Sequence, residues 1–239
     1  MKNLMKAEWF KLSKSFGFRV LCLCNVATVF STALLALAGA KATGFASFVM
    51  SLTYILHHAV IGYLFVAIFL CGEFSNRTYG LSLLCGYSRK KVFLSKILVF
   101  LLGLIWLFLI YTGVTTAVMS IANGFGQTDY MEVLVMLLCG ILGYAAMGAV
   151  IIFIAVITKK AFVTVGIGMG VTYALLWIET NLKEYSLSFV KYAYTYQIGQ
   201  LQFWGEGFSL WMFLVVTVLT FVIALVASIF IFDHTEKLM

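Results

Sequence analysis

The chain has 239 residues, of which 63% are hydrophobic and only 10% are charged, and its mean hydropathy is +1.06. A soluble domain carries roughly 25% charged residues, so this composition excludes an ordinary soluble protein and indicates a surface that mostly faces lipid. The formal net charge of +7 is typical of a membrane protein with a basic side facing anionic lipid, and no nucleic-acid partner is expected.

The N-terminal segment, residues 1–17, has the pattern of an amphipathic helix. Four apolar residues fall on one helical stripe at i, i+4, i+7 and i+11: Met5, Trp9, Leu12 and Phe16. Lysines occupy the other side, as in a helix that lies flat in the interface. We expect an elbow helix that links movement outside the membrane to the first span. The simpler alternative is a membrane anchor, and a cleavable signal peptide is a further one, although the apolar run that follows exceeds the usual 7–15 residues.

Six apolar stretches are about long enough to cross the hydrocarbon core as helices, which requires about 20 residues. They are residues 18–40, 52–71, 97–121, 133–157, 161–178 and 210–232. Because a backbone in lipid must satisfy its own hydrogen bonds, we expect an all-α protein with six transmembrane helices in a single domain over residues 1–239. Lys and Arg are retained on the cytosolic side, and thirteen of the sixteen fall on the side of the N-terminus. Both termini are therefore predicted to be cytosolic.

The connection after the second span, residues 72–96, carries a pattern of its own. Leu81 and Leu84 would share one face of a short helix that Gly86 ends, and Ser88 is placed to cap the start of the third span. A short helix that projects from a membrane domain and ends in basic residues is typical of a docking surface. We expect this segment to contact a partner.

The fifth span contains Gly166 and Gly170 in a GxxxG pattern. Such a face lets two helices approach closely, so helix packing is the expected use and a hinge is the alternative. The segment that follows, residues 179–208, is rich in aromatic residues. An interfacial aromatic belt explains much of this; the alternative is a re-entrant hairpin that forms an outer gate and touches cargo, with Tyr192, Tyr196, Trp204 and Glu206 as candidate residues.

The sequence lacks the residue patterns that metal binding, nucleotide binding and ion or proton relays require. The chain has three histidines, no HExxH and no CxxC pair, so we expect no metal site, and it has no GxxxxGK[ST] phosphate loop. Every Asp, Glu, Lys and Arg falls in a predicted loop or at a helix end, which disfavours an ion or proton relay. The chain is therefore predicted not to be an enzyme and to hold no cofactor. Any energy for active work would come from another protein.

Two of these segments resemble a known family. The run Glu8-Trp9-Phe10-Lys11-Leu12 resembles the opening of permease subunits of type-2 ATP-binding-cassette (ABC) transporters, and Glu73-Phe74, Arg77-Thr78, Leu84, Ser88-Arg89 and Lys96 resemble their motif between spans two and three. In size and style the chain is most similar to the bacitracin-resistance and lantibiotic-immunity group of Gram-positive permeases. Arg77 stands where the family usually has a glycine.

The resemblance implies a coupling helix in the 72–96 loop that inserts into a separate ATPase subunit. The contact residues it implies are Glu73, Phe74, Arg77, Thr78, Leu81, Leu84, Ser88 and Arg89. ATP and Mg²⁺ would bind in that partner, and a second permease, identical or related, would complete the pathway. The expected function is the export of an antimicrobial or amphipathic peptide across the cell membrane of a Gram-positive bacterium. The alternative is a non-transporting scaffold or sensor subunit.

Overall fold

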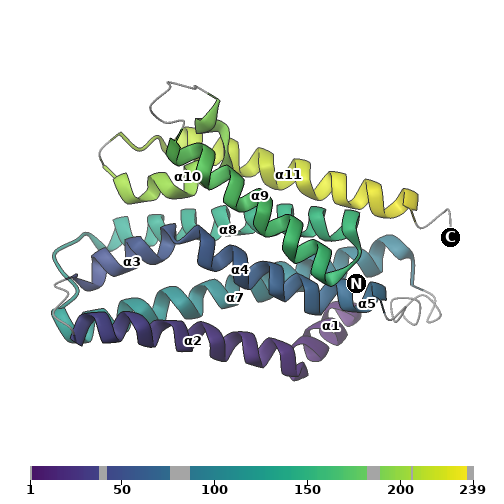
Figure 1. Cartoon of the computed structure of the whole chain (residues 1–239), viewed down its shortest axis with the longest axis horizontal. Helices are drawn as coiled ribbons and strands as arrows, with labels where there is room; N and C mark the ends of the chain where they lie inside the picture. The colour runs from purple at the N-terminus through teal and green to yellow at the C-terminus, as the bar shows by residue number, and fades with distance from the viewer. Residues whose placement is uncertain (1, 38–41, 76–86, 182–188, 206, 236–239) are drawn as a thin grey trace.

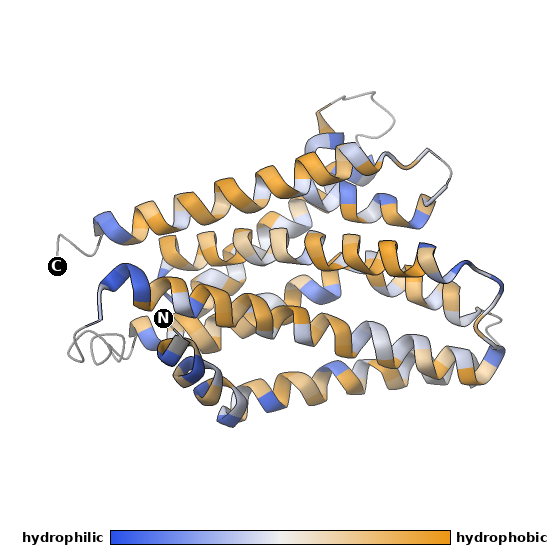
Figure 2. Ribbon diagram, turned by 180° about the vertical axis from the view of Figure 1, so that it is seen from behind, coloured by the Kyte–Doolittle hydropathy of each residue, from blue (hydrophilic) through white to orange (hydrophobic). Residues whose placement is uncertain are grey.

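The computed structural model describes residues 2–37, 42–75, 87–181, 189–205 and 207–235 of the chain. Over these residues the fold is a bundle of long helices that run side by side, without a strand (Figure 1). Apolar residues extend along the helices, and hydrophilic residues gather towards the two ends of the bundle (Figure 2). The arrangement confirms the predicted all-α membrane fold.

Among the described residues, five helical runs are long and apolar enough to cross a membrane. They are α4 Ile55–Val66 with the π-helix η1 Ala67–Cys71 and α5 Gly72–Ser75, then α7 Arg89–Asn123, α8 Tyr130–Thr158, α9 Ala161–Asn181 and α11 Leu210–Thr235. A sixth span results if α1 Lys2–Lys14 and α2 Phe16–Leu37, which are bent by 61°, count as one. Each of the six predicted apolar stretches corresponds to one of these runs.

The second apolar stretch differs from the expectation because it is interrupted. A separate helix, α3 Gly44–Thr53, precedes α4, and the two are divided at Tyr54, whose ψ of 65° is not helical. The break leaves carbonyl groups at the end of α3 without helical partners. The side chains of other residues satisfy two of them: His58 Nε2 lies 3.2 Å from the Ser51 carbonyl oxygen, and the Tyr144 hydroxyl donates to the Leu52 carbonyl at 3.0 Å.

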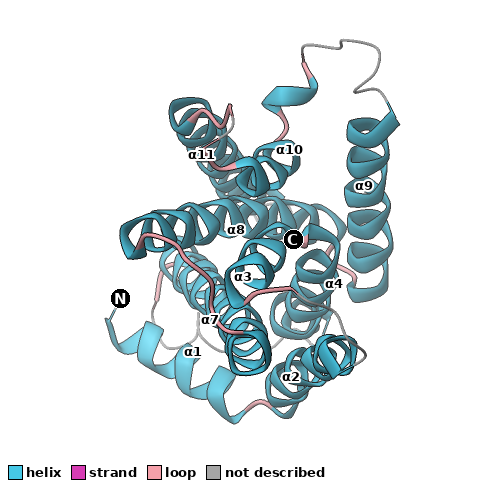
Figure 3. Cartoon of the chain, turned by 90° about the vertical axis from the view of Figure 1, so that its left-hand side faces the viewer, coloured by secondary structure: helices cyan, strands magenta, loops and turns pink. Residues whose placement is uncertain are grey.

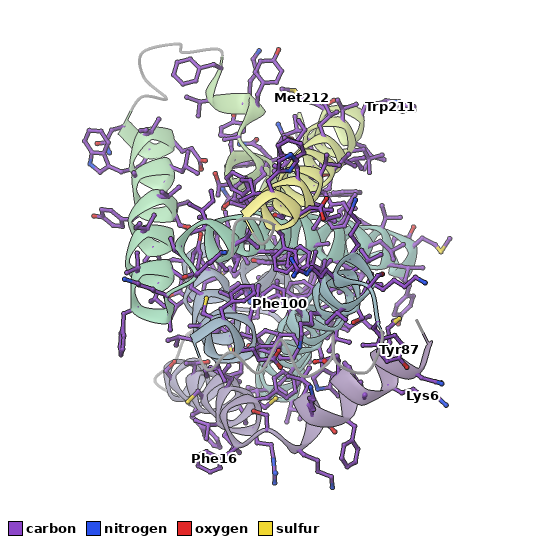
Figure 4. The ribbon with its side chains drawn as sticks, turned by 90° about the vertical axis from the view of Figure 1, so that its right-hand side faces the viewer. Lys6, Phe16, Tyr87, Phe100, Trp211 and Met212 are labelled. Atoms are coloured by element: carbon purple, nitrogen blue, oxygen red, sulfur yellow. The ribbon has the colours of Figure 1, made fainter. Side chains whose placement is uncertain are left out.

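The centre of the bundle is built on α7 and α8. Helix α7 packs against α1, α2, α3, α8 and α11, and α8 also packs against α9 and α11. Phe100 of α7 is 1% exposed and lies inside the bundle, whereas Phe16 and Trp211 point away from it (Figure 4). The exposed apolar side chains on the outer helices are the surface that a bilayer would cover.

Helix α9 stands at one side of the bundle and contacts α4 and α8 (Figure 3). The contact with α4 depends on Gly168, because a Cβ at this position would lie 2.1 Å from a ring atom of Tyr63. Gly166 and Gly170, the predicted packing pair, lie on the other side of the helix, and a Cβ at either would meet no atom within 4 Å. Among the described residues, the close helix approach on α9 is therefore made by the glycine between them.

The two ends of the bundle are formed by different helices. We call the end that holds α1, α5 and the last turn of α11 the proximal end, and the end that holds α3 and α10 the distal end (Figure 1). At the distal end, η3 Val190–Tyr192, α10 Tyr194–Gly199 and η4 Gln200–Phe203 follow one another. Helix α10 packs against α8, α9 and α11, and η4 packs against α3.

Candidate functional site

A cluster of three charged side chains, two of them buried and one partly exposed, lies at the proximal end. Lys96 of α7 is 1% exposed, and its Nζ lies 2.9 Å from a carboxylate oxygen of Glu8 in α1. The same ammonium group forms an ion pair with Glu73 of α5. We call these three residues the charge cluster. It joins the two segments whose motifs the sequence analysis singled out, although they are separated by more than sixty positions.

Glu8 reaches Lys96 because α1 turns one face towards the bundle. That face contains Leu4, Glu8 and Leu12, which are 5%, 1% and 2% exposed and are spaced at i, i+4 and i+8. Glu8 also accepts a hydrogen bond from Lys11, at 3.2 Å, whose side chain is 56% exposed. The ammonium of Lys96 is thus held by two carboxylates in a protected site, while Lys11 closes the cluster from outside.

Lys96 was expected in the loop before the third span, and this expectation was wrong. Helix α7 begins at Arg89, seven residues earlier than Lys96 and well before the apolar stretch that starts at residue 97. The lysine therefore sits in the third turn of α7 and faces the bundle instead of water. A buried charge requires partners because its desolvation costs several kcal/mol. The expectation that every Asp, Glu, Lys and Arg lies in a loop or at a helix end is therefore wrong for Lys96.

Aromatic packing at the proximal end joins the last helix to α5 and α7. Phe232 of α11 stacks on Phe93 of α7, with ring centroids 4.1 Å apart, and lies 6.1 Å from the ring of Phe74 in α5. Lys90 of α7 forms a 3.3 Å ion pair with Asp233 of α11. A displacement of α5 would therefore disturb contacts with α7 and α11 directly, and contacts with α1 through Lys96.

The predicted partner-contact residues divide into three groups. Glu73 and Phe74 lie in α5 and contact the bundle as described, while Arg77, Thr78, Leu81 and Leu84 are outside the described residues. Ser88 is the N-cap residue of α7 by its backbone, but its side chain makes no capping hydrogen bond. Ser88 and Arg89 are both exposed at the proximal end.

The predicted elbow stripe is divided between two environments. Leu12 is buried against the bundle, whereas Trp9 and Phe16 are 43% and 79% exposed. Met5 and Trp9 line a groove between α1 and α7 together with Phe10. Sequence periodicity placed the stripe one position away from the face that holds Glu8. The buried partner Lys96, and no local pattern on α1, explains why the face with Glu8 turns inwards.

Two of the predicted outer-gate residues, Tyr192 and Trp204, lie in different surroundings. Tyr192 is 64% exposed and lines an apolar groove beside Trp211, whereas Trp204 packs on Phe208 with ring centroids 4.8 Å apart. Tyr196 lies in α10, and Glu206 is outside the described residues.

Glu179, at the end of α9, is a residue that the sequence analysis did not select at the distal end. Its carboxylate accepts hydrogen bonds from the Thr195 hydroxyl and from the backbone N–H of Tyr196. Both donors lie in the first turn of α10, whose own N-cap residue, Ala193, offers no capping side chain. Glu179 therefore caps α10 from another helix, a position in which a carboxylate is favourable.

The histidine pair of α4 is built into the bundle. His57 Nε2 lies 2.8 Å from Asn25 Oδ1, and His58 is 4% exposed against Phe108 and Tyr144. Over the part of the chain that the structure describes, no three His, Cys, Asp or Glu residues are grouped as metal ligands.

Comparison with known proteins gives one family match. The model of a family described as ABC-2 family transporter protein matches residues 4–176, which include the charge cluster and the histidine pair. A comparison with curated proteins finds no match.

Proposed function

The chain belongs to the ABC-2 family of transporter proteins and is a membrane permease component, not itself catalytic; on this premise we propose that its charge cluster couples the permease to a separate ATPase subunit. The observation that carries the proposal is that one buried lysine, Lys96, holds both Glu8 and Glu73. The loop that follows Glu73 is the segment we expect to dock on the ATPase, so force applied there reaches α1 and α7 through the same ammonium group.

Several observations support a mechanical role for the cluster. The helix that carries Glu73 continues from η1, a π-helix, and π-bulges occur frequently at functional sites. Helices α1 and α2 are bent by 61° beside the cluster, so α1 can pivot at Ser15. In this proposal the ATPase alternates between two states, and each state favours one packing of α1, α5 and α7.

We place the proximal end in the cytosol. Basic residues gather there, as the positive-inside rule requires: Lys6, Lys11, Lys14, Arg89, Lys90, Lys91, Lys159 and Lys160. The ATPase must be on this side, because its ATP is in the cytosol. Ser88 and Arg89 are exposed at this end and would lie against it.

The proposed cargo is an antimicrobial or amphipathic peptide, moved outwards. The resemblance to immunity permeases supports this class, and so does the exposed aromatic surface at the distal end, which includes Tyr192 and Trp211. A second permease copy would complete the pathway. The uncovered Gly166 and Gly170 face of α9 offers a surface on which another helix can approach closely.

Cross-linking tests the ATPase contact directly. A Ser88→Cys variant in a cysteine-free background is purified from membranes together with its ATPase and treated with a short bifunctional reagent. A Gln127→Cys variant, exposed at the distal end, is the matched control. We expect an adduct with the ATPase from position 88 and none from position 127. If no ATPase co-purifies, or both positions react equally, the coupling assignment is wrong.

A further inference from the structure

The groove between α1 and α7 lies beside the inward face of α1 that holds Glu8, and its volume is about 630 Å³. This volume is within the range of roughly 300–1,000 Å³ that is usual for small-molecule sites. Its described lining consists of Met5, Lys6, Trp9, Phe10 and Ser13 of α1 and of Val99 and Leu102 of α7. The lining is therefore apolar apart from one cation, one hydroxyl and one indole N–H.

The groove continues into the surface that a bilayer would cover. Leu102, in its wall, is 49% exposed, and Trp106, one turn further along α7, is 54% exposed. Residues four positions apart lie on the same face of a helix, so an exposed apolar strip leads from the groove along α7 towards the middle of the bundle. A hydrocarbon chain that enters the groove can follow this strip.

One cation stands at the edge of the groove. Lys6 is exposed, its side chain extends away from the bundle (Figure 4), and it forms no ion pair among the described residues. The hydroxyl of Ser13 already donates to the Phe10 carbonyl at 2.9 Å. The ammonium of Lys6 and the indole N–H of Trp9 are thus the donors that the groove offers to a ligand.

The electrostatic surroundings of the groove favour an anion. The acidic residues described at the proximal end are already paired, Glu8 and Glu73 with Lys96 and Asp233 with Lys90. The described lining contains no Asp or Glu. A second cation, Lys14, lies 5.9 Å from the ring centroid of Phe10, which lines the groove. A ligand with a negative charge beside Lys6 therefore meets no unpaired carboxylate there.

We propose that this groove binds one anionic phospholipid, with an acyl chain against Val99 and Leu102 and the phosphate at Lys6. Lipid tails are as apolar as the groove walls, so the walls provide the fit of the chain and the charge of Lys6 provides the selectivity. The lipid would contact α1 and α7 together and hold the first helix against the bundle. Only the choice of the inner leaflet rests on the proposed cytosolic side; the site itself is independent of the ATPase coupling.

The test is native mass spectrometry of the full chain in detergent, titrated with dioleoylphosphatidylglycerol or with dioleoylphosphatidylcholine. The two lipids have the same chains and differ in net charge. We expect the first phosphatidylglycerol to bind about fivefold more tightly than the first phosphatidylcholine, the effect of one lysine beside an anionic head group. Lys6→Gln should abolish this preference and Lys6→Arg should retain it. Equal affinities of the parent chain for the two lipids would overturn the proposal.

Lys160→Gln is the matched control for the charge. Lys160 is exposed at the same end of the bundle, just before α9, which stands on the opposite side from α1 (Figure 3). This variant loses the same charge outside the groove and should keep the fivefold preference. If Lys160→Gln and Lys6→Gln lower the preference equally, the lipid is attracted by the basic surface in general and the assigned site is wrong.

Two further arms test whether the acyl chain occupies the groove. Leu102→Trp fills the groove and should weaken phosphatidylglycerol about fivefold or more, as overpacking does. Leu138→Trp, at a similarly exposed position on α8 outside the groove, should bind as the parent does. Free glycerol phosphate should not displace the lipid. Equal binding by the two tryptophan variants, or displacement by glycerol phosphate, would contradict a lipid site. No ATPase is present, so these outcomes leave the coupling proposal untouched.

Discussion

Lys96 of α7 and Glu8 of α1 are 88 positions apart, yet their charged atoms lie 2.9 Å from each other and both side chains are almost completely buried. Burial makes this pair sensitive to removal of either partner, because the remaining charge would be unpaired in a site of low polarity. The distance between the two residues in the chain makes the pair a direct link between the first helix and the centre of the bundle.

Removal of the lysine charge should destabilise the permease strongly. Lys96→Met leaves the Glu8 and Glu73 carboxylates facing each other, and we expect a loss of about 3–5 kcal/mol in the free energy of unfolding, measured by denaturant or thermal unfolding in detergent. Lys11→Met removes the exposed partner of the same Glu8 and should cost less than about 1 kcal/mol. Equal losses in the two variants would show that the buried ion pairs of Lys96 contribute no more to stability than the exposed ion pair of Lys11.

The two carboxylates should act as one unit with the lysine. Glu8→Gln and Glu73→Gln each remove a carboxylate charge that pairs with the Lys96 ammonium group. Their effects on stability should therefore not add, with an interaction energy of about 0.5–3 kcal/mol. The measurement is a double-mutant cycle. Glu132→Gln, in the first turn of α8, combined with Glu8→Gln should be additive; additivity in both pairs would contradict the cluster.

Glu179 should hold α10 in place. Glu179→Ala removes the carboxylate that caps the first turn of α10 from α9, and we expect a local loss of about 0.5–2 kcal/mol, typical of a lost helix cap. Hydrogen exchange across residues 190–203 reports it as faster exchange, whereas α8 should exchange as before. Unchanged protection of this segment would mean that the packing of α10 is sufficient without the cap.

The glycines of α9 should respond differently to the same substitution. Gly168→Ala places a Cβ within 2.1 Å of Tyr63 and should cost about 1–3 kcal/mol, as overpacking does. Gly170→Ala meets no atom of the described chain and should be neutral or stabilise an isolated permease slightly, since Ala favours the helix. The measurement is thermal unfolding of the monomeric protein. A loss for Gly170→Ala only in the assembled state would locate a second helix on this face.

The hydroxyl of Tyr144 should stabilise the break between α3 and α4. Tyr144→Phe removes the donor to the Leu52 carbonyl and leaves that carbonyl buried, so we expect a loss of about 1–3 kcal/mol. Tyr173→Phe on α9, where the ring is 63% exposed, is the control and should change stability by less than about 0.5 kcal/mol. Equal unfolding midpoints for the two variants would argue against this role.

The sequence alone determined the class of the protein and the positions of its spanning helices. Long apolar runs, few charges and a one-sided distribution of Lys and Arg are local properties that any fold of this chain must accommodate in a bilayer. The motifs around Glu8 and Glu73 were visible for the same reason, because each is contiguous. The family match over residues 4–176 agrees with the class that these motifs suggested.

The tertiary structure decided which of these residues meet. Helical periodicity predicts a buried face but cannot tell which of two adjacent stripes on α1 turns inwards. That choice depends on Lys96 of α7, which pairs with Glu8. It likewise could not show that Tyr54 divides a continuous apolar run, since the freed carbonyls are satisfied by His58 and by Tyr144, a residue 92 positions away from Leu52. Pairing between distant segments is a property of the packed bundle, and a single sequence carries no local signal of it.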